Sequence, residues 1–159
     1  MIVTQYDACN PYALDKIKAD RLAGYLDGDC QWPSHGWSMF PGIPKVRITT
    51  RANDLADCYD WEKGTAPLST VKVQVLFRAK AYLPSAVYCS EDKWEDAYVK
   101  LAGLPVVWWV AAWGASAWPT LRVGGRTIKA AAWQEVSLPT YDVSRVNSEA
   151  WPVLGEPAP

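Results

Sequence analysis

Two carboxylates, Asp60 and Glu62, stand two residues apart, directly after the short run 56–59. If that run is a strand that continues to position 62, side chains i and i+2 point to the same face, with Cα atoms roughly 6.6 Å apart. The paired carboxyl groups of glycoside hydrolases lie about 5–9.5 Å apart, depending on mechanism. The spacing therefore predicts an acid–base pair for glycan cleavage. The competing interpretation is two solvated acids before a turn at Lys63-Gly64.

The elements that must position this pair alternate between strands and helices. Apolar runs and period-two alternation predict strands over residues 2–6, 24–26, 45–49, 56–61, 86–89, 106–112, 127–133 and 141–143. Helical periodicity and capping signals predict helices over residues 10–22, 34–40, 67–82 and 90–102, and a helical turn from Ser144. The first helix would begin at Asn10-Pro11, and Gly103 would end the helix that Ser90 caps.

This alternation predicts an α/β fold, specifically a compact, irregular β/α barrel of the TIM type with some helices missing. The wholly apolar run 106–112 is typical of a strand that is buried on both faces. A typical barrel of this type has about 250 residues, whereas this chain has 159. Residues 50–55 are too few for a helical crossover, so we expect missing helices or a locally antiparallel part. An open doubly wound sheet is the alternative. Residues 1–154 would form one domain, and residues 155–159 an extended tail.

In a β/α barrel the chemistry lies at the carboxyl ends of the strands. Acids are frequent at these predicted ends. The residues that stand there are Asp7, Asp27, Asp29, Asp60, Glu62, Cys89, Ser90, Trp113, Gln134, Glu135 and Asp142. Clustered carboxylates repel one another, and this repulsion raises some of their pKa values. The pattern favours a catalytic rim, while solvated loops remain the simpler explanation.

Composition excludes several classes of protein. Half of the residues are hydrophobic and the net charge is −1, so neither disorder nor nucleic-acid binding is indicated. No apolar run approaches the roughly 20 residues that span a bilayer, which argues against membrane insertion. The ten Trp residues could stack on sugar rings or fill the core.

The N-terminus and the cysteines bear on the cellular compartment. The first residues lack a basic start and a long apolar stretch, which predicts synthesis in the cytoplasm without a signal peptide. The four cysteines, Cys9, Cys30, Cys58 and Cys89, lack metal-ligand spacing, and His35 is the sole histidine. We therefore expect four free thiols, no disulfide needed for folding, no metal and no cofactor. Cys58 is expected in the core.

Four short motifs in order resemble the family-25 glycoside hydrolases, the lysozymes of bacterial and phage lysis, and especially short relatives from actinobacteria and their phages. Tyr6-Asp7 is similar to the end of the family's first strand, and Asp60-Trp61-Glu62 to its Asp-x-Glu signature. The run 107–113 is similar to its sixth strand. Ala132-Trp133-Gln134, followed by residues 141–144, is similar to its closing motif.

The resemblance implies a muramidase that cuts the glycan strand of peptidoglycan, either after release in phage lysis or as part of a virion. The sequence leaves the oligomeric state open, and we expect a monomer. Glu62 would be the general acid, and Asp60 would polarise or orient the reacting group. Retention of configuration could proceed through the substrate's own N-acetyl group, which Asp60 would then support. Asp7 and Asp142 would complete the catalytic cluster. The expected substrate-binding residues are Asp27, Asp29, Trp61, Trp109, Trp113, Trp133 and Gln134.

Two departures from the family pattern keep a second hypothesis open. The second strand ends in Asp27-Gly28-Asp29, which is unusual for the family, and the chain is shorter than typical members. The alternative is a non-catalytic glycan-binding or structural phage or cell-wall protein on a degenerate barrel.

Overall fold

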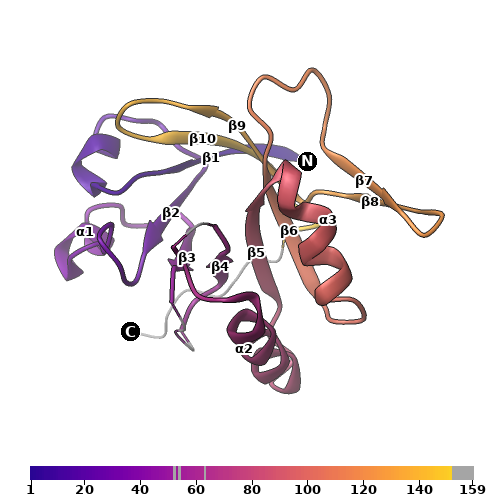
Figure 1. Ribbon diagram of the computed structural model, residues 1–159. Helices are drawn as coiled ribbons and strands as arrows, with labels where there is room; N and C mark the ends of the chain where they lie inside the picture. Colours follow the sequence, from indigo (N-terminus) through magenta and orange to yellow (C-terminus); the bar gives the residue numbers. More distant parts are fainter. Residues whose placement is uncertain (52, 54, 63, 152–159) are drawn as a thin grey trace.

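Eight strands close into a barrel in the computed structural model, which describes residues 1–51, 53, 55–62 and 64–151 (Figure 1). They are β1 (Ile2–Asp7), β2 (Arg21–Tyr25), β3 (Lys45–Thr49), β4 (Cys58–Asp60), β5 (Ser85–Ser90), β6 (Val106–Ala111), β9 (Ala132–Ser137) and β10 (Asp142–Asn147). The order around the barrel is β1-β10-β9-β6-β5-β4-β3-β2. The predicted irregular β/α barrel is confirmed, and the open doubly wound sheet is wrong.

Neighbouring strands of this barrel run parallel, except that β10 is antiparallel to both β1 and β9. Both expected irregularities therefore occur. The antiparallel part is β10 rather than the chain around residues 50–55, because β3 and β4 pair in parallel. Their short connection has no helix among its described residues.

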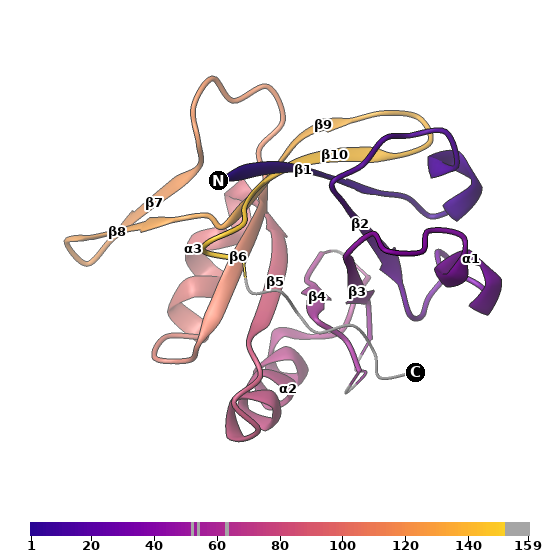
Figure 2. The ribbon, with the colours of Figure 1, turned by 180° about the vertical axis from the view of Figure 1, so that it is seen from behind.

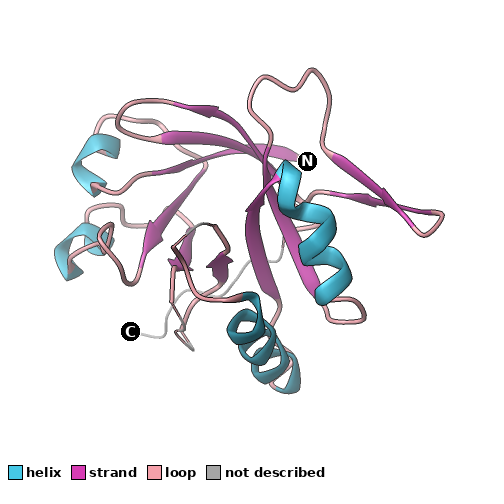
Figure 3. Cartoon of the chain, in the orientation of Figure 1, coloured by secondary structure: helices cyan, strands magenta, loops and turns pink. Residues whose placement is uncertain are grey.

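Helices cover little of the barrel (Figure 3). The described ones are the 3₁₀ turn η1 (Pro11–Leu14), the short α1 (Ser34–Ser38), α2 (Leu68–Lys80) and α3 (Glu91–Lys100). A hairpin of β7 (Thr120–Val123) and β8 (Arg126–Lys129) connects β6 to β9, where a regular barrel would have a helix. None of the described helices has the length and apolar character needed to cross a bilayer.

Three predicted elements are wrong. The helix over residues 10–22 is reduced to η1, because residues 21–25 form a barrel strand that pairs with both β1 and β3. The strand over 127–133 is divided between β8 and β9. The helical turn from Ser144 is instead part of β10, where Ser144 and Val146 are buried. In each case pairing with distant strands outweighs the local propensity.

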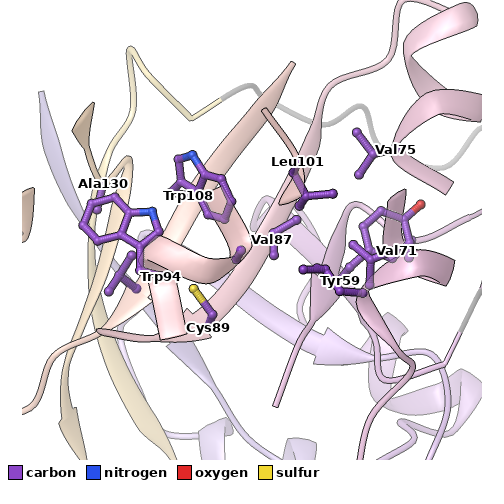
Figure 4. Packing of buried hydrophobic residues seen from close by; sticks show 13 residues of the cluster. Tyr59, Val71, Val75, Val87, Cys89, Trp94, Leu101, Trp108 and Ala130 are labelled. Atoms are coloured by element: carbon purple, nitrogen blue, oxygen red, sulfur yellow. The ribbon is translucent and has the colours of Figure 1, made fainter. Parts of the chain in front are cut away.

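Side-chain alternation along the strands produces two apolar regions. Inward-facing residues such as Ala86, Trp109 and Val146 fill the barrel. Outward-facing residues of β4, β5 and β6, together with α2 and α3, form an outer cluster. Figure 4 shows Trp94 and Trp108 at one end of this outer cluster, Val71 and Val75 at the other, and Val87 between them.

A disulfide joins Cys9 to Cys30, so the prediction of four free thiols is wrong for this pair. The two cysteines follow β1 and β2, which are adjacent in the barrel, and closure of the barrel brings their loops together. Cys58 and Cys89 are free and buried, as expected for a core position at Cys58. Next to the disulfide, Trp32 packs in a third apolar cluster and its indole Nε1 donates to Ala8 O.

Candidate active site

A pocket of about 130 Å³ opens at the carboxyl end of the barrel strands. Strand register explains which side chains meet there. Asp7 lies opposite Asp142 across β1 and β10, and Asp60 lies beside Tyr88 across β4 and β5. The pocket is lined by Asp7, Tyr25, Ile48, Asp60, Glu62, Tyr88, Trp109, Trp113, Gln134 and Asp142.

Local hydrogen bonds hold the Asp60–Glu62 segment in place. Strand β4 ends at Asp60, but the next residue, Trp61, still donates its backbone N–H to Tyr88 O. Beyond it, the Thr65 hydroxyl accepts from the Glu62 backbone N–H and donates to Glu62 O, each at 2.9 Å. The chain thus turns directly after Glu62, and both carboxyl side chains line the same pocket.

Asp7 is the most deeply buried carboxyl of the group. Burial raises its pKa well above the ordinary value, and the charges of Asp142 and Asp60 raise it further. Its Oδ1 is enclosed and has no hydrogen-bond partner among the described residues. Protonation of Asp7 removes much of this repulsion, so we infer that Asp7 is a neutral carboxyl within the cluster.

Asp60 and Glu62 also hold their protons more tightly than ordinary carboxyl groups do. Burial, and then the charge of Glu62, raises the pKa of Asp60 to about 7. Burial raises the pKa of Glu62 as well, with a contribution from Asp142, while Lys93 opposes the shift. A carboxyl group whose pKa lies close to the working pH can act as a general acid.

Aromatic side chains form the walls of the pocket. The Trp109 indole is buried, donates to Ser144 Oγ at 3.0 Å and meets the Tyr88 ring edge-on. Trp113 is 61% exposed and lies at the mouth. Burial raises the pKa of both Tyr25 and Tyr88, so their hydroxyls stay protonated and can donate hydrogen bonds. An aromatic wall with polar groups above it suits a sugar ring, which has an apolar face and a hydroxyl rim.

Four of the expected substrate-binding residues do not line this pocket. Trp61 packs against the outer cluster with Lys93 over its ring, and Trp133 alternates outward from β9 and donates to Ala112 O. Asp27 accepts hydrogen bonds from Thr49 and Thr50 and so ties the β2 loop to the end of β3. Asp29 lines a separate open groove.

Three lining residues escaped the sequence analysis, namely Tyr25, Ile48 and Tyr88. Each is an inward-facing aromatic or apolar residue near the carboxyl end of its strand, whereas the residues expected at the site are mostly acids or lie after a strand end. Period-two alternation through β5, in which Ala86 and Tyr88 share a face, was the signal that could have found Tyr88.

Comparisons with known proteins bear on the fold. No family model matches the sequence, and no protein of curated function matches it. The fold is similar to a solved structure described as a family GH25 lysozyme from Aspergillus fumigatus. The TM-score is 0.62, the match covers 93% of this chain and 95% of that chain, and the two are 15% identical. The resemblance to family-25 lysozymes is thereby confirmed at the level of the fold.

Proposed function

We propose that this protein is a glycoside hydrolase that cleaves the glycan strand of peptidoglycan, as a muramidase that acts in phage lysis or from a virion. One observation carries the proposal. Asp7, Asp60, Glu62 and Asp142 converge in one pocket at the carboxyl end of the barrel, where barrel enzymes perform their chemistry. The lysozyme fold of the similar structure supports the same reading.

Glu62 is the general acid in this proposal. Its raised pKa keeps a proton available for the glycosidic oxygen as that bond breaks. The leaving sugar then departs as a neutral alcohol, and positive charge develops on the ring that stays behind. The same residue, now ionised, takes a proton from the water that completes hydrolysis.

Asp60 acts on the substrate's acetamido group. In its ionised form it accepts the N–H of that group, which turns the acetamido oxygen toward the anomeric carbon and strengthens its attack. Asp60 has a pKa of about 7, so its own ionisation falls within the working range. Retention of configuration follows from two inversions: the acetamido oxygen attacks the anomeric carbon from the face opposite the leaving group, and water then displaces that oxygen from the face that the leaving group has vacated.

Asp7, Asp142, Gln134 and the aromatic walls position the sugar. The protonated Asp7 donates a hydrogen bond to a substrate hydroxyl, so the substrate would partner its carboxyl group, whose Oδ1 has no partner among the described residues. Trp113 is exposed at the mouth of the pocket and provides a surface on which a sugar ring can stack. Trp109 is held by Ser144 and forms the floor.

One observation favours the alternative of a non-catalytic glycan-binding protein. The pocket measures about 130 Å³, whereas ligand pockets commonly measure about 300–1,000 Å³. A pocket of this size encloses only a small part of a glycan strand. Such a limited contact is enough for a protein that binds the glycan without cleaving it.

The deciding experiment measures reducing ends released from purified peptidoglycans of several chemotypes. Wild type should release them with a bell-shaped pH profile, in which the acidic limb reflects the carboxyl cluster and the basic limb reflects Glu62. Glu62→Gln should lower the rate about 10²–10⁴-fold and keep the thermal midpoint. Glu95→Gln, an exposed glutamate on α3, is the matched control and should be fully active. Equal rates for wild type and Glu62→Gln would exclude Glu62 as the acid. No release from any chemotype, with glycan binding intact, would favour the binding protein.

A further inference from the structure

Helix α2 exposes an unusual number of large apolar side chains. Val73 is 62% exposed and Phe77 is 57% exposed, with Leu76 between them in sequence. Just beyond the helix, Tyr82 is 96% exposed and Leu83 is also open. We call these five residues the α2 face. Scattered exposed apolar residues are normal, but a contiguous group of this kind marks an interaction surface.

The α2 face is not needed for the core. Leu68, Val71 and Val75 on the opposite side of α2 pack into the outer cluster. Val73, Leu76 and Phe77 follow the i, i+3, i+4 spacing of a single helical stripe. Figures 1 and 2, which view the molecule from opposite sides, show α2 projecting from the barrel, with no other described element over its outer side.

The charged residues that the segment of the α2 face exposes have one sign. Lys72 and Lys80 are exposed on the same side of the helix. The sequence contains no Asp or Glu between Glu62 and Glu91, so the whole segment that carries the face is basic. A second copy of the chain would place lysines against lysines there, with no carboxylate on either face to compensate. The charge pattern therefore argues against self-association through α2.

The position of α2 leaves the candidate active site accessible. The helix follows the carboxyl end of β4 and precedes the start of β5. Its last turn, and Tyr82 and Leu83 just beyond it, thus lie at the end of the barrel opposite the acidic pocket. A surface that covers the α2 face would leave the pocket open, and a negatively charged surface would meet lysines rather than the carboxyl cluster.

We propose that the α2 face docks on an anionic lipid bilayer surface. Leu76, Phe77 and Leu83 enter the boundary between headgroups and acyl chains, and Tyr82 lies at headgroup level with its hydroxyl in water. Lys72 and Lys80 extend to anionic headgroups. The protein lies on the membrane and does not cross it. This inference is independent of the proposed function, because it uses none of the residues in the pocket.

The test is co-sedimentation of the whole protein with large unilamellar vesicles, either phosphatidylcholine alone or a phosphatidylglycerol–phosphatidylcholine mixture. Wild type should bind the anionic vesicles and only weakly the neutral ones, and binding should fall as salt rises. Leu76→Ser with Phe77→Ser should abolish binding. Lys72→Gln with Lys80→Gln should weaken it about thirtyfold, at about 1 kcal/mol for each lysine. The thermal midpoint of each variant is recorded to confirm folding.

Val136→Ser with Leu138→Ser is the matched control, because these two residues are each 40% exposed on and beside β9, away from α2. It should bind vesicles like wild type. The proposal is overturned if wild type binds neither kind of vesicle, if it binds both equally, or if the control loses as much binding as the α2 variants. A concentration-dependent dimer that Phe77→Ser disrupts would also overturn it and would assign the face to a second copy.

Discussion

Trp108 and Trp109 are neighbours in β6, yet they serve opposite sides of the barrel wall. Trp109 faces inward and lines the acidic pocket, whereas Trp108 faces outward and packs with Trp94 of α3. In β5, Tyr88 likewise faces the pocket while Val87 joins the outer cluster. Alternation along a strand thus separates the pocket from the packing that supports it by a single residue.

The two sides differ in what they contribute to stability. The outer cluster is almost wholly apolar and stabilises the fold through burial. The pocket instead holds carboxyl oxygens of Asp7 and Asp60 that are enclosed and have no partner among the described residues. Such groups destabilise a folded state. Packing of the outer cluster under α2 and α3 therefore offsets the loss of stability that the buried carboxyl groups of the candidate active site cause.

The largest effect on stability is expected in the outer cluster. Trp94→Ala should lower the free energy of unfolding by about 3–5 kcal/mol, because it removes a buried indole and leaves a cavity. Trp94→Phe should cost much less, since the Trp94 Nε1 has no hydrogen-bond partner among the described residues. Chemical denaturation measures both values. If the folded Trp94→Ala protein also had a strongly reduced turnover, the outer cluster and the pocket would not contribute independently to stability and to activity.

The disulfide is the next largest contributor. Cys9→Ser with Cys30→Ser should lower stability by about 2–4 kcal/mol, because the crosslink restricts the unfolded chain. Reductant should destabilise wild type by a similar amount and leave the double variant unchanged. Wild type unfolded without reductant should show two titratable thiols per chain, those of Cys58 and Cys89. Four thiols in that assay would contradict the crosslink.

Asp60→Asn should stabilise the protein at high pH. The folded-state pKa of Asp60 is about 7 against an ordinary value of 3.8, so the folded state binds the proton more tightly than the unfolded state does. Stability of wild type therefore falls as pH rises from about 4 to about 7, and the full penalty persists above 7. The variant cannot ionise, so at pH 8 it should exceed wild type by about 1–3 kcal/mol and lose activity.

Thermal midpoints across pH measure this difference. Below pH 4 the two midpoints should converge, because wild-type Asp60 is then protonated in both states. Asp29→Asn, at an exposed position outside the pocket, should show no such gain at pH 8. A destabilised Asp60→Asn at pH 8 would show that the charged form makes stabilising contacts.

The smallest effect is expected at the mouth of the pocket. Trp113→Ala should raise KM about two- to tenfold, as loss of one stacking contact of about 0.5–1.5 kcal/mol requires. Its thermal midpoint should hardly move, because the side chain is 61% exposed. Trp133→Ala is the contrasting variant, since it removes an outward-facing buried ring and should affect stability more than KM. If Trp133→Ala raised KM more than Trp113→Ala did, the glycan would bind over the outer side of the barrel and not at the mouth of the pocket.

The sequence by itself predicted the barrel and its acidic rim. Strand β6 is an apolar run and β3 alternates between polar and apolar residues, and Asp7, Asp60 and Glu62 stand at or just after the carboxyl ends of their strands. Both features are local, because strand formation and alternation depend on neighbouring residues. Parallel strands then bring their carboxyl ends to one rim, which is why acids far apart in the sequence could be expected together. Asp142, expected at the end of a last parallel strand, instead begins the antiparallel β10.

Only the tertiary structure decided which side chains meet. It turned Trp109 and Trp113 to the pocket and Trp61 and Trp133 away from it, since a shift of one residue along a strand reverses the face. It also inserted β10 antiparallel, which placed Asp142 opposite Asp7, and it brought Cys9 to Cys30. These pairings depend on how the barrel closes. Because the free energy of closure is distributed over the whole chain, no local pattern of residues predicts them.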